Sequence, residues 1–236
     1  MAVAYKPLWV LLAVFLLAFQ AFAEEKDPDP FESWNRKVFT FNDWADRYVL
    51  RPVATGYTRV TPDPVERGIT RMFSNLGEVP NLINSVLQAK PRDAANATGR
   101  FLVNSTVGVL GFFDVARHVG LEKADGEDFG QTLGRWGVPS GPYLVLPFLG
   151  SSTLRDAPAL FVDAHTHPIY YIDDEGVRIG VSTLSLISTR ANLLTTESLV
   201  SGDRYLFFRD VYLQRREFLV RDGEVEDDFG DFDDYY

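Results

Sequence analysis

The sequence predicts a mainly α-helical protein with a single domain. Apolar residues recur at spacings of three and four through several long segments, which is the period of a helix. Prolines and capping residues separate these segments, and the alternation of apolar and polar residues that marks a strand is scarce. No internal repeat and no long Pro/Gly/Ser linker divides the chain, so we expect its helices to share one fold.

Four helices are predicted in the first half of the chain. The first begins near Phe31 and is expected to end at Arg51-Pro52, because the residue before a proline avoids the helical region. Asp63-Pro64-Val65-Glu66 combines an N-cap residue, a first-turn proline and an acid at the capping-box position, so it predicts the start of the second. Residues 79–87 predict a third helix and residues 92–107 a fourth.

The middle of the chain is less regular. Residues 108–115 are apolar but too rich in glycine for a helix, whereas residues 129–137 predict a short one. The segment Gly141–Gly150 (GPYLVLPFLG) contains two prolines, which reject a regular helix. It is therefore either a buried extended segment or an exposed apolar loop.

Three more helices are predicted in the last third. Ser152 or Thr153 can cap a helix that runs to about Asp163. Two others are expected near residues 177–194 and 203–221. The last of these places several large side chains on one side: Tyr205, Phe208, Tyr212 and Leu219.

The N-terminal segment predicts export. Lys6 precedes an unbroken apolar run from Leu8 to Phe19, which is shorter than the roughly 20 residues that a membrane-spanning helix needs. Ala21-Phe22-Ala23 then supplies the small-x-small pattern that a signal peptidase recognises. We expect residues 1–23 to be a signal peptide, residues 24–221 the domain, and residues 222–236 an acidic, disordered tail. A short N-terminal membrane anchor is the alternative.

Charge and cysteine content exclude several classes of function. The net charge is −10, and the tail from Asp222 to Tyr236 holds eight acidic residues and no basic residue. The acidity therefore belongs mainly to the tail, and no basic face for nucleic acid is expected. The chain has no cysteine, which removes disulfides, thiolate metal sites, a cysteine nucleophile and acylation at an N-terminal cysteine.

Residues 163–167 (DAHTH) are the strongest candidate for catalysis. Asp-x-His-x-His resembles the first metal motif of amidohydrolases, but a metal site of that kind needs more histidines than the one other in this chain, His118. A helix end leading into the loop at Pro168 is the simpler interpretation of Asp163, His165 and His167. Nucleophile-elbow and nucleotide-binding glycine motifs are absent. Neither an enzyme nor a metal or other cofactor is predicted.

An ordered set of motifs resembles the MlaA/VacJ family. The longest stretch runs from Gly141-Pro142-Tyr143 through Leu146-Pro147-Phe148 to Thr153-Leu154-Arg155-Asp156. Others, in chain order, are Asp29-Pro30-Phe31-Glu32, Arg51-Pro52-Val53-Ala54, Arg100-Phe101-x-x-Asn104, Phe129-Gly130-x-Thr132-Leu133-Gly134, Thr189-Arg190-Ala191 and Tyr212-x-Gln214-Arg215. The resemblance covers nearly all of the predicted domain.

The resemblance implies a ring of amphipathic helices around an amphipathic channel, at the inner leaflet of a Gram-negative outer membrane. Such a protein removes phospholipids from the outer leaflet and passes them to a soluble periplasmic carrier similar to MlaC. Trimeric porins are implied as further partners, and the transported phospholipid as the bound ligand. Because this family typically has an acylated first cysteine, we expect this chain to be exported to the periplasmic side of the outer membrane without an N-terminal lipid anchor. Its amphipathic helices or a partner would then attach it.

Two other functions remain open from the residues. One is a structural envelope protein that binds a porin without moving lipid. The other is a metal-dependent hydrolase at Asp163, His165 and His167.

The resemblance also suggests candidate lipid-path residues. Leu144, Val145, Leu146 and Phe148 are the candidates for a loop that gates or lines the path, with Gly141 and Gly150 as flanking hinges. The charged residues in the matching late motifs are candidates for contact with the headgroup: Arg155, Asp156, Arg190 and Arg215. Ion pairs and helix caps are the competing interpretation of these four.

Overall fold

The structure, a computed structural model, describes residues 27–195 and 202–224, and these form a mainly helical fold, as predicted. The predicted signal peptide and residues 225–236 of the tail lie outside the described residues. The elements, in chain order, are α2 (Glu32–Ala45), η1 (Asp46–Leu50), α3 (Arg51–Val60), α4 (Asp63–Leu87), α5 (Pro91–Thr106), α6 (Val115–His118), α7 (Phe129–Arg135), β1 (Tyr143–Leu146), β2 (Gly150–Thr153), α8 (Asp156–Thr166), η2 (Pro168–Tyr171), α9 (Glu175–Leu193) and α10 (Arg204–Val220).

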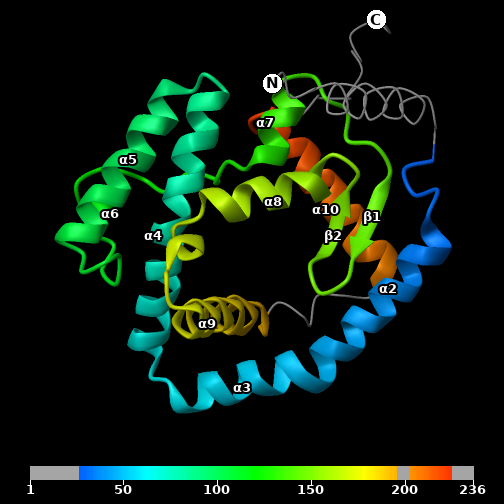
Figure 1. Ribbon diagram of the computed structural model, residues 1–236, viewed down its shortest axis with the longest axis horizontal. Coiled ribbons are helices and arrows are strands. Elements are labelled where there is room, and N and C mark those ends of the chain that lie inside the picture. Colours follow the sequence, from blue (N-terminus) through cyan, green and yellow to red (C-terminus); the bar gives the residue numbers. More distant parts are fainter. Residues whose placement is uncertain (1–26, 196–201, 225–236) are drawn as a thin grey trace, which may run out of the picture.

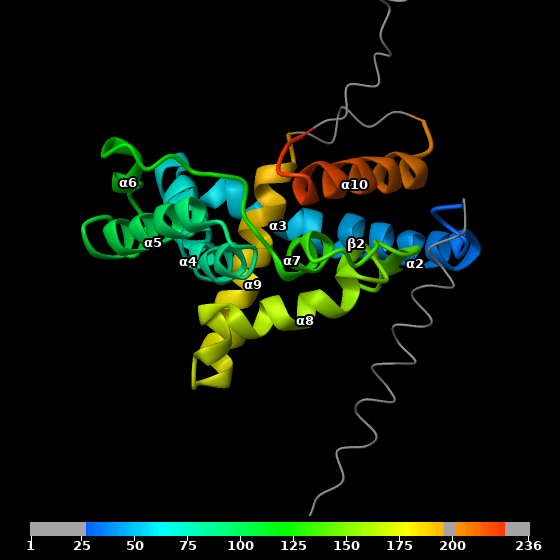
Figure 2. The same ribbon diagram turned by 90° about the horizontal axis from the view of Figure 1, so that it is seen from above.

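The elements are arranged around an open centre (Figure 1). α2 and α3 form one side, α4 the next and α8 a third, and the turn of the β1–β2 hairpin lies beside the opening. Seen from above, α8 and α10 lie on opposite sides of the layer that contains α2, α7 and the hairpin (Figure 2). α9 is seen end-on in Figure 1 and lengthwise in Figure 2, so it runs through the thickness of this layer.

The first predicted helix does not end at Arg51-Pro52, so this prediction is wrong. α2 passes into the π-helical turn η1, in which the N–H of Arg51 donates to the carbonyl of Asp46, and the chain continues directly into α3. The wider π turn gives the ring of Pro52, the second residue of α3, room beside the preceding turn. One curved segment therefore replaces the predicted helix and break.

The segments predicted as the second and third helices form the single helix α4, with Pro80 in its interior. α4 packs along α5 mainly through polar groups. The buried guanidinium of Arg100 donates through Nε to Oε1 of Glu78 at 2.9 Å, and Asn81 donates to Oε2 of the same carboxylate at 2.9 Å. A buried carboxylate needs such partners to remain charged.

Residues 107–114 form turns after α5, as their glycine content predicted. The ring of Phe112 reaches back to Gly68 of α4, where a Cβ atom would lie 2.2 Å from Cε2 of the ring. Gly68 is therefore required for this close approach, and any side chain there would displace Phe112.

Each interpretation of Gly141–Gly150 holds for part of the segment. β1 pairs antiparallel with β2, from Tyr143 opposite Thr153 to Leu146 opposite Gly150, and Tyr143 and Val145 are buried. Phe148, at the turn, is 76% exposed. The segment is thus a strand that leads to an apolar tip.

Side chains bond backbone N–H groups at or near the start of the last three long helices. Thr153 accepts a hydrogen bond from the N–H of Asp156 at 3.2 Å, so α8 starts close to the predicted cap. Asp174 accepts from the N–H of Val177 at the start of α9, and Asp203 accepts from the N–H of Tyr205 at the start of α10. The observed bounds of α9 and α10 differ from the predicted ones by two residues or fewer.

In the described residues many polar side chains are buried and many large apolar side chains are exposed, unlike in an ordinary soluble domain. The apolar core is small and centres on Val38, Tyr143, Val145 and Tyr205. Many buried side chains are polar, among them Asn35, Asn84, Gln88, Arg100, Gln131, Arg155 and Asp156. Large apolar side chains are exposed instead on most helices, among them Trp34, Trp44, Val60, Val86, Leu102, Phe161 and Leu186. The amphipathic helices therefore turn much of their apolar surface outward.

Candidate functional site

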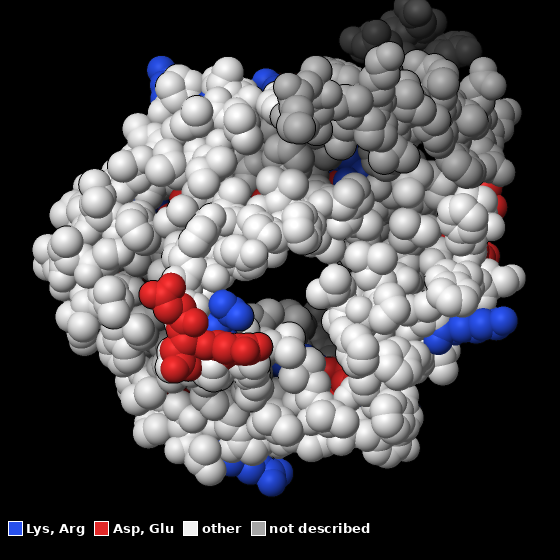
Figure 3. Space-filling model, in the orientation of Figure 1, with Lys and Arg blue, Asp and Glu red and all other residues white. Residues whose placement is uncertain are grey.

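The centre of the molecule is the candidate functional site. In the space-filling view an opening remains visible between the elements that surround it, so side chains do not fill it on this face (Figure 3). Within the described residues, no helix is both long enough and apolar enough to cross a bilayer.

Two asparagines of α2 fasten the hairpin beside the opening. Asn35 is fully buried; its Nδ2 donates to the carbonyl of Tyr143 at 2.9 Å, and its Oδ1 accepts from the N–H of Val145 at 2.9 Å. Asn42 acts in the same way at the tip, donating to the carbonyl of Leu146 at 2.9 Å and accepting from the N–H of Phe148 at 2.8 Å. Amide side chains thus replace a third strand along the free edge of β1.

This hairpin contains the predicted lipid-path loop. Val145 is buried against α2, Leu144 and Leu146 are half-buried, and Phe148 projects at the tip, where its ring lies 5.1 Å from that of Phe41. The structure thus brings the four residues together beside the opening, and their contact with lipid stays a prediction.

The predicted hinges lie at the two ends of the strand and turn. Gly141 has φ +66° and Gly150 has φ +83°, a backbone conformation that residues other than glycine rarely adopt. Gly150 also pairs with Leu146 in the hairpin ladder. A hinge motion at these positions stays a prediction.

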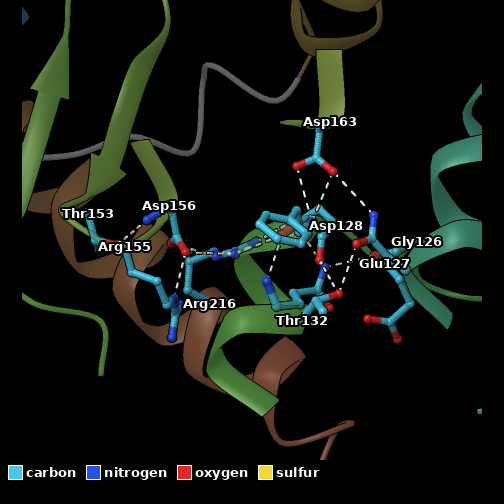
Figure 4. Close-up of polar contacts among 12 residues, drawn as sticks. Gly126, Glu127, Asp128, Thr132, Thr153, Arg155, Asp156, Asp163 and Arg216 are labelled. Carbon is cyan, nitrogen blue, oxygen red and sulfur yellow. Dashed lines mark hydrogen bonds and ion pairs between the residues drawn. The ribbon is translucent and has the colours of Figure 1, made fainter. Parts of the chain in front are cut away.

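Arg155 and Asp156 lie in a buried ionic network between α7, α8 and α10 (Figure 4). Arg155 Nε donates to Oδ1 of Asp156 at 2.8 Å, and Arg216 donates to the same carboxylate through Nε at 2.9 Å and Nη2 at 3.1 Å. Arg216 also donates through Nη2 to Asp128 at 3.0 Å, and the Tyr212 hydroxyl donates to Asp156 at 2.9 Å. This placement agrees with the ion-pair interpretation of Arg155 and Asp156, and their contact with a headgroup stays a prediction.

The electrostatics of this network favour its charged form. Burial alone would raise the pKa of Asp156, but the hydrogen bond from Arg155 and the charge of Arg216 outweigh burial and lower this pKa. The pKa of Asp128 is also lowered, because Arg216 outweighs the effect of burial there. Each carboxylate is therefore held as an anion by a guanidinium group, and the network braces three helices.

Sequence reasoning missed Arg216, which occupies the centre of the network. The helical period could have identified it, because Arg216 follows Tyr212 by four residues and so shares the predicted face of α10 with Tyr205 and Tyr212. Arg215, the residue that was predicted, lies on the surface and pairs with Asp125 at 3.0 Å; both side chains are about 60% exposed.

Arg190 is also part of an ion pair. It is buried on α9 and binds Asp46 of η1 with two hydrogen bonds, through Nε at 2.6 Å and Nη2 at 2.9 Å. This bidentate pair ties α9 to the π-helical turn. The four predicted charged residues therefore lie at three separate places: one buried network, one helix pair and one exposed surface.

The three residues of the metal hypothesis, Asp163, His165 and His167, do not form a common metal site. Asp163 accepts from the backbone N–H of Phe129 at 2.9 and 3.1 Å, and so caps the start of α7. Nδ1 of His165 lies 2.7 Å from the carbonyl of Phe161, and Nδ1 of His167 accepts from the N–H of Ile169 at 3.3 Å. Among the described residues no group of three or more metal-binding side chains is found.

Asp163 predicts a pH dependence of stability. Burial, only partly offset by the hydrogen bond from Phe129, raises its pKa to about 6, and nearby Asp128 adds to the rise. Because the folded protein binds this proton more tightly than the unfolded chain, its contribution to stability is present below pH ~4 and is lost as the pH rises through about 6. Urea denaturation of wild type and Asp163→Asn between pH 4 and pH 7 should therefore show a stability difference that shifts toward the variant as the pH rises. A difference that is constant over this range would contradict the prediction.

Comparison with known proteins agrees with this architecture. The profile of the family described as MlaA lipoprotein matches residues 27–219. The chain is 37% identical over 203 residues to the intermembrane phospholipid transport system lipoprotein MlaA of Shigella flexneri and 36% identical to the protein of the same name from Escherichia coli K12. Each alignment covers 84% of this chain and 80% of the relative.

A solved structure reported as the structural basis for maintenance of bacterial outer membrane lipid asymmetry is also similar. It aligns with a TM-score of 0.73 at 36% identity, over 82% of this chain and all of that chain. The family match spans most of the chain, and the relatives and the solved structure each cover more than 80% of it. This chain belongs to the MlaA family.

Proposed function

We infer that this protein takes part in phospholipid transport between membranes and thereby maintains the lipid asymmetry of the outer membrane. The observation that carries this inference is the pattern of burial: large apolar side chains are exposed around an open centre, and many of the buried side chains are polar. Water would penalise this arrangement, whereas acyl chains favour it. The names of the relatives, which belong to an intermembrane phospholipid transport system, support the same role.

We further propose that the opening is the route of the lipid, taken from the outer leaflet and passed to a soluble periplasmic carrier similar to MlaC. A trimeric porin is the proposed partner in the membrane. Transport of this kind requires no covalent step, so the protein is proposed to act as a transport component and not as an enzyme. The individual partners found for Asp163, His165 and His167 support this proposal over the metal hydrolase.

Attachment to the membrane is proposed to depend on exposed aromatic side chains. The relatives are named lipoproteins, whereas this sequence contains no cysteine. On α2, on η1 and at the tip of the hairpin, four exposed rings form an aromatic surface in which each ring lies within 6.4 Å of the next: Tyr48, Trp44, Phe41 and Phe148. Aromatic side chains are favoured at the boundary between headgroups and acyl chains, so this surface would rest there.

Trp44→Asp tests this attachment. Trp44 is 55% exposed, so the substitution should leave the fold intact while it removes apolar area and adds a charge that resists burial. We expect binding to phosphatidylethanolamine–phosphatidylglycerol vesicles, measured by co-flotation, to weaken about tenfold or more. Gln214→Asp on the exposed side of α10 adds the same charge and should bind as wild type does. Equal binding by Trp44→Asp and wild type would contradict the proposed attachment.

The proposed function itself is tested in cells and on the purified full chain. A strain without the gene should accumulate phospholipid in the outer leaflet of its outer membrane, and a plasmid copy should reverse this. Mass spectrometry of the detergent-extracted protein should find phospholipid bound to it. Unchanged outer-leaflet phospholipid in the deletion strain would refute the transport role, and recovery of a porin without phospholipid would favour a structural role instead.

A further inference from the structure

A cavity of about 480 Å³ lies between the end of α8, η2 and the first half of α9. This volume falls within the roughly 300–1,000 Å³ of small-molecule sites. Arg178, Ser182 and Ser185 line it from α9, and His167 and Tyr170 line it from the facing segment. Because Arg178, Ser182 and Ser185 are spaced by four and three residues, they lie on one face of α9. Side chains of both signs of charge lie at the edge of the central opening over the start of α9 (Figure 3).

The lining of this cavity suits an anion. It contains an arginine, a histidine and several hydroxyl groups, and none of the residues that line it is acidic. Arg178 is half-buried and makes no ion pair with the described residues; its Nη1 donates to the carbonyl of Ile172 at 3.3 Å. A guanidinium group has five N–H donors in a planar fork that matches the oxygens of a phosphate. Most of these donors are left for a ligand.

His167 can provide a second donor. Its Nδ1 accepts from the N–H of Ile169 at 3.3 Å, which places the proton of the neutral ring on Nε2. Burial lowers the pKa of His167, so the ring is neutral near pH 7 and donates without a charge of its own. One full positive charge, on Arg178, therefore faces the ligand, which matches the single negative charge of a phosphodiester.

The apolar lining residues and the acidic residues near Arg178 restrict the kind of anion that can bind. Ala164 and Ile169 on the facing segment and Ile179 on α9 add apolar side chains to the lining, as the glycerol and the first methylenes of a lipid require. Asp173, Asp174 and Glu175 lie one turn before Arg178 and are exposed, and Asp174 also caps α9. Their negative charge disfavours ligands with several negative charges and tolerates a headgroup that carries an ammonium beside its phosphate.

We propose that this cavity binds the phosphodiester of a glycerophospholipid headgroup, with Arg178 as its charge partner and Ser182, Ser185 and His167 as hydrogen-bond donors. The site rests on the proposed transport function and gives it a place where the headgroup is recognised at the rim of the opening. It lies apart from Arg155, Asp156, Arg190 and Arg215, whose charges are already paired within the fold.

The test uses the purified full chain and a short-chain phosphatidylethanolamine as the probe. We expect Arg178→Gln to raise the dissociation constant at least about tenfold, because it removes a charge-assisted contact. Ser182→Ala should raise it severalfold while it leaves every charge in place. Arg92→Gln is the matched control, since Arg92 is an exposed arginine outside the cavity, and it should bind as wild type does. Thermal denaturation of each variant confirms that the fold is retained.

Two further ligands test which part of the lipid the cavity recognises. A short-chain diacylglycerol has the same tails without the phosphate and should bind weakly to wild type and equally to Arg178→Gln. Inorganic phosphate should not displace the lipid at millimolar concentration; if it does, the site recognises free phosphate, and the lipid proposal is overturned.

Different experimental results would refute the proposed headgroup site and the proposed transport function. If Arg178→Gln and wild type bind the probe equally, the cavity is not the headgroup site, even where phospholipid still copurifies with the protein. If wild type neither binds the probe nor copurifies with phospholipid, both proposals are wrong. Loss of binding in Arg178→Gln and in Arg92→Gln alike would also overturn the site, because it would show a general effect of charge.

Discussion

Replacing Asp156 with asparagine is expected to lower the free energy of unfolding by about 3–5 kcal/mol, the cost of breaking a buried ion pair from one side. Asp156 is 4% exposed and accepts hydrogen bonds from Arg155, Tyr212 and Arg216. Asparagine keeps the shape but removes the negative charge, so Arg155 loses the carboxylate it pairs with and Arg216 keeps only Asp128. A buried excess of positive charge is the source of the penalty.

Urea denaturation in detergent measures this change. Asp210→Asn is the matched control, because Asp210 also pairs with an arginine of α10, Arg209, but its side chain is 50% exposed. Exposed pairs contribute less than about 1 kcal/mol, so the control should be close to wild type. If Asp156→Asn were as stable as Asp210→Asn, the network would not be the brace between α7, α8 and α10.

A loss of stability here should also affect transport. Asp156 begins α8, and Arg216 links it to α10 and to Asp128 before α7. Because α8 and α10 lie on opposite sides of the layer that contains the hairpin (Figure 2), weakening their connection loosens the elements around the opening. We therefore expect Asp156→Asn to lower outer-membrane lipid asymmetry in cells even at equal protein abundance.

The sequence predicted the helices well where local signals decide them. Asp174 and Asp203 are N-cap residues before regular apolar spacing, and α9 and α10 begin within two residues of the predicted positions. The join at Pro52 was not predictable in this way, because the π-helical turn before it follows from the path of α2 and α3 around the opening. The hairpin was missed because four residues per strand give too little alternation to distinguish a strand from a loop.

The spacing of apolar residues also does not decide which face of an amphipathic helix is buried. Trp34 and Phe41 belong to the apolar residues of α2 at helical spacing, and in the structure both are exposed, while Asn35 is buried. Spacing predicts that one face differs from the other, and the surroundings decide which face turns inward. The buried ionic network was unpredictable for a related reason, since its central contact joins Asp128 to Arg216, which are 88 residues apart. No local pattern encodes such a pair.

Asn35→Ala is expected to lower the free energy of unfolding by roughly 2–4 kcal/mol, because it leaves several buried polar groups without partners. Asn35 bonds the carbonyl of Tyr143, the N–H of Val145 and the carboxylate of Asp29, at 2.8 to 2.9 Å. Alanine provides none of these bonds, and the site has no exposure through which water could replace them easily. Hydrogen exchange should show the largest local effect at the Val145 amide.

Asn96→Ala is the control for this change. Asn96 also bonds a backbone carbonyl, that of Glu122 at 2.8 Å, but in an exposed position, so its loss should cost less than about 1 kcal/mol. Asn42 still holds the tip of the hairpin in the Asn35 variant, so the strand should loosen at Val145 before the turn at Phe148 does. If Val145 exchanged no faster in Asn35→Ala than in wild type, pairing with β2 alone would hold β1 in place. Since the turn of this hairpin borders the opening, Asn35 would then have no part in holding the hairpin beside it.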